Sequence, residues 1–181
     1  MESPASTKWH TQRVSVCLRF VALIASLAAV IAFAYSQNLH DMEVVTTADM
    51  GHHMVTQATG TTEYAFIWSL IIISIELSTP VDLHPGIYVT FDLIAWVAPA
   101  IGICLYLASM EPYYAGDGYS CGRDYRDCDG KQIANVEHFG SAMGFLAVIV
   151  HFGFFVRACR ATDKLRKSQR TWKKQMVGNA A

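Results

Sequence analysis

The sequence is poor in charge, and positive charge is missing from most of its length. Charged residues make up 16% of the 181 residues, and no lysine or arginine lies between Phe20 and Gly122. Hydrophobic residues make up 52%, which is too apolar a composition for an ordinary soluble domain. The composition therefore leaves no room for a separate soluble domain and predicts a membrane protein, for which we expect no cofactor and no nucleic-acid partner.

The apolar residues are gathered into four blocks. A membrane-spanning helix needs about 20 predominantly apolar residues, and each block is close to that length. We therefore predict an all-α fold, an integral membrane four-helix bundle, with spans at residues 14–36, 61–79, 87–108 and 138–158. A segment at 1–13 precedes the four-span domain at 14–160, and a basic tail at 161–181 follows it.

The few cations lie mainly at the two ends of the chain. The positive-inside rule places such segments in the cytoplasm, so both termini are expected there, with residues 37–60 and 109–137 as outer loops and 80–86 as an inner turn. A basic segment directly after a span is also expected to bind anionic lipids of the inner leaflet. A topology signal without lipid binding is the alternative for these cations, which are Arg160, Lys164, Arg166, Lys167, Arg170, Lys173 and Lys174.

The first block also fits a second interpretation. A basic front, an apolar run and the small residues of Ala32-Phe33-Ala34 describe a cleavable signal peptide. Cleavage would remove Arg19 and leave three spans, whereas the length of the block favours a fourth span. After the last block, Cys159 is placed for palmitoylation.

Histidines and methionines gather in the first outer loop. His40 and Met42 precede the compact set Met50-Gly51-His52-His53-Met54, and imidazole and thioether groups are ligands that suit copper. An exposed loop with incidental histidines and methionines explains the same residues, because no second cluster is present to receive an ion. We therefore predict no metal site.

The second outer loop carries a pair of cysteines. Cys121 and Cys128 are the only cysteines in either outer loop, and the outer side of a membrane is oxidising. Two thiols are too few for zinc, which takes about four ligands. We expect a disulfide between them, worth roughly 2 to 3 kcal/mol in the loop-entropy model.

Four ionisable residues lie at one depth in the spans. Counted from the cytoplasmic ends at about 1.5 Å per helical residue, this intramembrane charge layer contains Arg19, Glu76, Asp92 and His151. Because charges in hydrocarbon become tolerable through pairing, Arg19 and Asp92 predict an ion pair that locks the bundle. A proton or ion path through Glu76, Asp92 and His151 is the alternative, but the outer halves of the spans are almost wholly apolar in sequence.

Two further features concern packing. Gly140 and Gly144 form a small-xxx-small pattern, which favours close helix packing. Trp68 and Tyr106 are expected at the membrane interfaces, where aromatic rings with a polar end are enriched.

The combination of these features resembles a known family. Four spans, an arginine in the first span (LRFVALIASLAAV) and an aspartate in the third (FDLIAW) are similar to the MARVEL superfamily, including the Casparian strip membrane proteins. The short chain, the cysteines in the second outer loop and the basic tail are similar to small fungal members. The resemblance covers roughly residues 14–160, and its arginine and aspartate correspond here to Arg19 and Asp92.

The resemblance implies a protein that is not an enzyme. MARVEL-type proteins organise membrane microdomains or appositions, form homo-oligomers or bind other membrane proteins, and this implies a scaffold, with the plasma membrane as its location. The residues themselves offer no nucleophile with a matching base on the aqueous side. The alternative function is a small transporter or ion-channel subunit that uses the charge layer, and a polar stripe through the outer half of the bundle would favour it.

Overall fold

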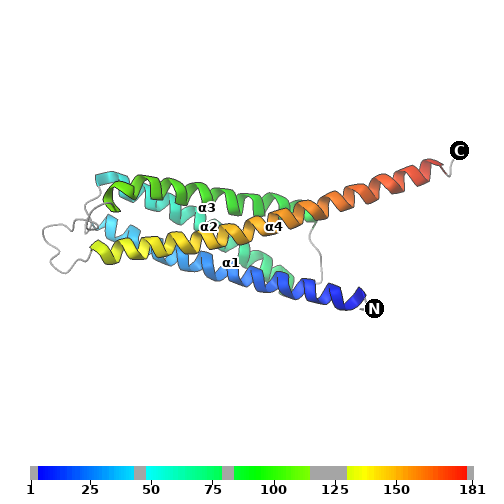
Figure 1. The fold of residues 1–181 in the computed structure, drawn as a ribbon, viewed down its shortest axis with the longest axis horizontal. Coiled ribbons are helices and arrows are strands. Elements are labelled where there is room, and N and C mark those ends of the chain that lie inside the picture. Colours follow the sequence, from blue (N-terminus) through cyan, green and yellow to red (C-terminus); the bar gives the residue numbers. More distant parts are fainter. Residues whose placement is uncertain (1–3, 43–47, 79–83, 115–129, 179–181) are drawn as a thin grey trace.

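The computed structural model consists of four long helices (Figure 1). Residues 4–42, 48–78, 84–114 and 130–178 are described. The helices are α1 (Pro4–Asp41), α2 (Ala48–Ser78), α3 (Pro85–Tyr114) and α4 (Gly130–Gly178). Within these residues, all four helices are long and apolar enough to cross a membrane, which confirms the prediction of an all-α, multi-pass membrane protein.

The helices form a ring in chain order. Helix α1 packs against α2 and α4, and α3 packs against α2 and α4. Both termini lie at the same end of the bundle, which we call the terminal end (Figure 1). Helix α2 ends and α3 begins there, while the opposite end, the loop end, holds the end of α1 and the start of α4.

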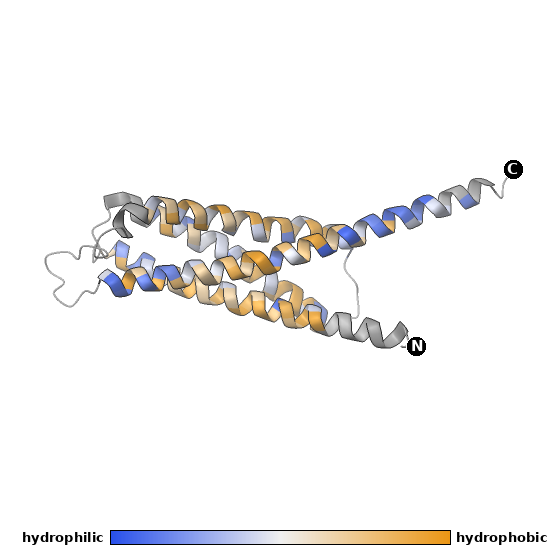
Figure 2. Ribbon diagram, in the orientation of Figure 1, coloured by the Kyte–Doolittle hydropathy of each residue, from blue (hydrophilic) through white to orange (hydrophobic). Residues whose placement is uncertain are grey.

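The outer surface of the bundle is apolar. Large hydrophobic side chains such as Ile24, Ile31 and Ile149 are more than 60% exposed, and hydrophobic residues cover the middle of the helices (Figure 2). The inward face of α1 instead buries small residues, including Ala22 and Ala29. This distribution suits a bilayer, because lipid tails solvate apolar side chains while small residues let helices pack closely. The outer face therefore contacts lipid.

The helices extend well beyond the apolar blocks. The predicted outer loop at 37–60 is largely helical, because α1 continues to Asp41 and α2 begins at Ala48. Hydropathy marks where a chain lies in hydrocarbon, but a helix continues wherever one face still packs. In α2 that face contains Val55 and Ala58, which are buried in the core of the bundle. The same applies to α4, which begins before residue 138 and buries Ile133 and Ala134 there. Helix α1 also begins before the predicted span, at Pro4.

Helix α4 is the longest element. Its 49 residues correspond to about 70 Å at 1.5 Å per residue, whereas a bilayer core is about 30 Å thick. The predicted basic tail is thus a helical continuation of the last span, and it leaves the bundle at the terminal end as a hydrophilic arm (Figure 2).

Candidate functional site

A buried ion pair joins α1 to α3. Arg19 Nη1 donates to Asp92 Oδ1 at 2.7 Å, and Arg19 Nη2 donates to Asp92 Oδ2 at 2.9 Å. The two side chains are 3% and 0% exposed. A bidentate guanidinium–carboxylate pair fixes direction as well as distance. The predicted contact between Arg19 and Asp92 is therefore present, in its most specific geometry.

The other two helices complete the hydrogen bonding of Asp92. Trp68 Nε1 on α2 donates to Asp92 Oδ1 at 2.8 Å, and His151 Nδ1 on α4 lies 3.3 Å from the same oxygen. His151 Nε2 lies 3.1 Å from the hydroxyl of Ser69. An ionised carboxylate only accepts, so His151 Nδ1 carries the shared proton, and in a neutral ring Nε2 accepts from Ser69. We call Arg19, Trp68, Ser69, Asp92 and His151 the charge centre.

Aromatic rings cover the charged atoms. Arg19 Cζ lies 3.8 Å from the ring centroid of Phe154 and 5.8 Å from that of Tyr88. Trp68 stacks on Phe91 with ring centroids 4.6 Å apart. A guanidinium in hydrocarbon gains from the negative face of a ring. The rings therefore pack against the guanidinium and restrict the movement of the ion pair.

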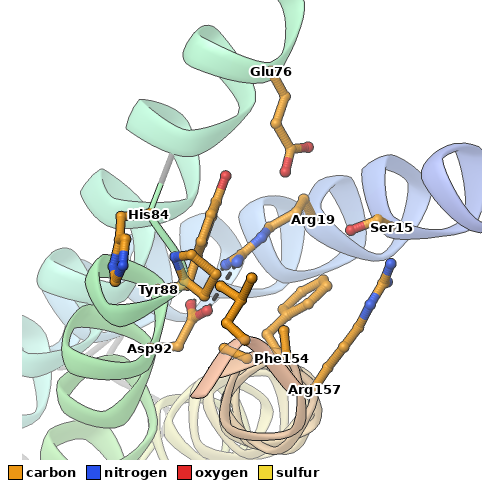
Figure 3. A pocket seen from close by; sticks show the side chains of 12 residues that line it. Ser15, Arg19, Glu76, His84, Tyr88, Asp92, Phe154 and Arg157 are labelled. Atoms are coloured by element: carbon orange, nitrogen blue, oxygen red, sulfur yellow. Dashed lines mark hydrogen bonds and ion pairs between the residues drawn. The ribbon is translucent and has the colours of Figure 1, made fainter. Parts of the chain in front are cut away.

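Glu76 stands apart from the other members of the predicted charge layer. It lies near Arg19 and points toward it (Figure 3). Its Oε2 is buried, yet it has no hydrogen-bond partner among the described residues. The structure thus brings Arg19, Asp92 and His151 into contact and leaves Glu76 beside them.

Trp68 and Tyr106 do not lie at the membrane interfaces, so that expectation is wrong. Trp68 is 6% exposed and bonds Asp92, while Tyr106 is fully buried with its ring edge against Phe33. A buried indole N–H needs an acceptor, and the Asp92 carboxylate supplies one. The sequence contained one sign of the inward face of α2: Ser69, next to Trp68, and Glu76 are seven residues apart, which places these two polar residues on one face of a helix.

A second polar cluster is buried near the loop end. Glu137 is fully buried, accepts a hydrogen bond from the Ser36 hydroxyl, and lies 3.2 Å from His40 Nε2. We call these three residues the outer cluster. The half of the bundle toward the loop end is therefore not almost wholly apolar, as its sequence suggested, because α1 and α4 bury Ser36, at the end of the first predicted span, together with His40 and Glu137, which lie beyond the predicted spans.

Three hydroxyl groups between the two clusters bond the backbone of their own helices. Ser26 donates to Ala22 O at 2.7 Å, Thr62 donates to Ala58 O at 2.9 Å, and Ser141 donates to Glu137 O at 2.9 Å. Along α1, the buried apolar residues Ala29 and Phe33 separate the two clusters. These three hydroxyls thus satisfy their own helices.

The predicted packing glycines face two neighbouring helices. A Cβ on Gly140 would lie 3.0 Å from Ala32 Cβ on α1, and a Cβ on Gly144 would overlap Ile103 Cδ1 on α3. The first separation is tighter than nine in ten real Cβ contacts, and the second would require Ile103 to move. Glycine at these positions therefore allows α4 to pack tightly against both helices.

A pocket of about 670 Å³ opens beside the charge centre at the terminal end (Figure 3). Side chains from all four helices line it, including Arg19, Glu76, Tyr88 and Arg157. Ligand sites are commonly clefts of about 300 to 1,000 Å³ with a few polar groups in an apolar wall. The size and lining of this pocket fall within that description.

The remaining predicted sites differ in how far the structure describes them. Cys121 and Cys128 lie outside the described residues, as do the side chains of Met50 and His52. Among the described cysteines, Cys159 is a half-buried free thiol. No group of three His, Cys, Asp or Glu side chains in the described part of the chain is arranged to hold a metal.

The cations of the tail lie on the helical arm of α4. Arg160, Lys164 and Arg166 are exposed, and Lys167 Nζ lies 2.7 Å from Asp163 Oδ2 one turn away. Exposed pairs of this kind contribute little to stability. The arm therefore presents a surface with a strong excess of positive charge.

No protein-family model, no curated protein and no solved structure matches this chain. The fold and the buried charge centre define the class of protein without such a match. The chain is a multi-pass membrane protein whose four helices meet at one buried, hydrogen-bonded ion pair.

Proposed function

We propose that this chain is a non-enzymatic membrane scaffold of the MARVEL type, which organises a membrane microdomain or apposition site. The observation that carries the proposal is the contact of Asp92 with the three other helices. Both of its oxygens accept from Arg19, and Oδ1 is also contacted by Trp68 and His151, so residues of all four helices meet at one carboxylate. Such an arrangement fixes which helices are neighbours, as a buried polar group often does.

A fixed bundle suits a scaffold better than a conduit. A transport site must exchange its partners during a cycle, whereas the Asp92 carboxylate is engaged with three side chains and the Phe154 ring packs against its partner Arg19. The hydroxyls of Ser26 and Thr62, which lie between the charge centre and the outer cluster, bond their own helices. These contacts support a role in which the bundle holds its shape and presents its outer faces to lipid and to other proteins.

The terminal end is the cytoplasmic end in this proposal. The positive-inside rule favours that orientation, because the cations concentrate on the arm of α4. The arm then lies next to the anionic inner leaflet and is suited to bind it.

Counting photobleaching steps tests whether the protein assembles. The full chain, tagged at its C-terminus and reconstituted at low density in supported bilayers, is expected to give spots with several steps. A single-span protein with the same tag is the control and is expected to give one step. A distribution dominated by one step, as in the control, would contradict the scaffold.

The outer cluster favours a second candidate, a small transporter or ion-channel subunit. It places a buried acid, Glu137, near the loop end, while Asp92 lies toward the terminal end. Two buried acids at different depths are what an ion path requires. The test is proton flux into liposomes. Flux above that of empty liposomes that is abolished in Glu137→Gln would replace the scaffold with this candidate, and no flux would exclude it.

A further inference from the structure

The pocket at the terminal end holds two opposite charges that form no ion pair within the described part of the chain. Glu76 on α2 has a buried Oε2 without a hydrogen-bond partner among the described residues. Arg157 on α4 also lines the pocket and forms no ion pair within the described part of the chain. Leaving a buried polar atom unsatisfied is costly, so its persistence points to a partner that comes from outside the chain.

Apart from the ion pair of the charge centre, the pocket lining carries one negative and one positive charge. Asp92 is neutralised by Arg19, which leaves one negative charge on Glu76 and one positive charge on Arg157. Arg19 adds an N–H donor, because its Nε is buried without a partner in a residue that is 2% exposed. A ligand that matches this wall carries both an anionic and a cationic group.

The positions of the two charges suggest how such a ligand lies. In Figure 3, Arg157 extends beside Ser15, while Glu76 points toward Arg19. Guanidinium and hydroxyl donors together suit a phosphate oxygen. A carboxylate with a free lone pair suits an ammonium group, which is a donor only. The two ends of the ligand are therefore a phosphate and an amine with N–H groups.

The rest of the wall indicates that the ligand is a lipid. Tyr88, Phe154 and Leu165 line the pocket, and it lies at the end of the bundle where α2 ends and α3 begins. The bilayer boundary holds phospholipid headgroups at this level, and the apolar wall can contact the glycerol backbone and the start of the acyl chains.

We propose that this pocket binds the headgroup of a phospholipid with a primary ammonium group, as in phosphatidylethanolamine. Arg157 and Ser15 donate to the phosphodiester, and Glu76 accepts from the ammonium. A headgroup that carries only a phosphate leaves Glu76 unsatisfied. The proposal goes beyond the scaffold function and does not depend on it, since a transporter with this pocket would bind the same lipid.

Native mass spectrometry of the full chain in mild detergent tests this directly. Phosphatidylethanolamine, phosphatidylcholine and phosphatidylglycerol with identical acyl chains are added separately, and the bound fraction is measured against concentration. The expected result is about tenfold tighter binding of phosphatidylethanolamine than of phosphatidylcholine, because methylation removes the N–H donors that bond Glu76. Equal affinity for these two lipids, or tighter binding of phosphatidylglycerol, would overturn the proposal.

Matched variants assign the effect to the pocket. Glu76→Gln is expected to reduce the preference for the ethanolamine headgroup, and Arg157→Gln is expected to weaken both phosphatidylethanolamine and phosphatidylcholine by about tenfold. Glu63→Gln and Arg160→Gln are the controls, since both residues are exposed and lie outside the pocket. A loss of preference in the controls, or none in Glu76→Gln, would contradict the assignment. If a variant does not fold, the preference of the unmodified chain for phosphatidylethanolamine over phosphatidylcholine still tests the proposal.

A soluble competitor separates the lipid from a free headgroup. Glycerophosphoethanolamine has the same phosphate and ammonium but no acyl chains. At the concentration that saturates the lipid, it is expected to displace less than a tenth of the bound phosphatidylethanolamine. Full displacement at that concentration would contradict a lipid ligand and assign the pocket to a soluble phosphate ester.

Discussion

The ion pair between Arg19 and Asp92 makes a quantitative prediction about the stability of the bundle. Replacing Asp92 by leucine leaves the Arg19 guanidinium buried at 3% exposure and removes the acceptor of the Trp68 N–H group. Removing one partner of a buried ion pair costs about 3 to 5 kcal/mol. We therefore expect Asp92→Leu to lower the free energy of unfolding by about that amount.

The reverse change is expected to cost less. In Arg19→Leu, the Asp92 carboxylate keeps the Trp68 N–H group as a donor and the contact with His151 Nδ1 at 3.3 Å. The double variant leaves neither charge buried. Its loss should be smaller than the sum of the single losses by about 1 to 3 kcal/mol, the range of coupling for residues in contact.

Reversible unfolding in mixed micelles measures these free energies. The full chain is titrated with a denaturing detergent while helix content and tryptophan fluorescence are followed, and the four members of the cycle are compared. Glu63→Leu serves as a control on an exposed position. A loss in the double variant equal to the sum of the two single losses would refute the reasoning, because it would show that the contact contributes no coupling energy.

Three further predictions use the same chain. Trp68→Phe should lower the free energy of unfolding by about 1 kcal/mol, because the Trp68 N–H group donates to Asp92. Trp96→Phe is the matched control, since Trp96 Nε1 has no partner among the described residues. Equal losses in the two variants would contradict a stabilising role of the Trp68 hydrogen bond. Gly144→Ala should cost about 1 to 3 kcal/mol by overlap with Ile103, while Gly153→Ala has open space around it and should cost almost nothing; the same titration measures both, and equal effects would argue against close packing of α4. A membrane-impermeant thiol reagent should label Cys121 and Cys128 from outside only after reduction, and labelling without reductant would exclude the disulfide or the proposed topology.

The sequence was sufficient to predict the four helices and the ion pair. Long apolar blocks report burial in hydrocarbon, and Arg19 and Asp92 are each an isolated charge within such a block. Matched depth then restricts their choice of partner, because an unpaired charge in lipid is costly. These two predictions rest on position along the helix axis, which hydropathy encodes.

Rotation about the helix axis is not encoded in the same way. Polar residues are few in α2 near Trp68, and the spacing of Ser69 and Glu76 was the one sign of its inward face, so the sequence alone did not establish that Trp68 faces Asp92 instead of the interface. The outer cluster was missed for another reason. His40 and Glu137 lie beyond the ends of apolar blocks, in the predicted outer loops, and Ser36 is the last residue of the first block, whereas the extended helices bury all three.

The central claim, that this four-helix protein organises membrane, is tested most directly by photobleaching recovery in the source cell. The full chain, tagged at its C-terminus and expressed at its native level, is bleached within single patches, and its distribution is recorded in the same experiment. A single-span membrane protein with the same tag gives the rate of free diffusion. The scaffold account predicts stationary patches that recover far more slowly than this control. Recovery at the rate of the control from an even distribution would contradict it.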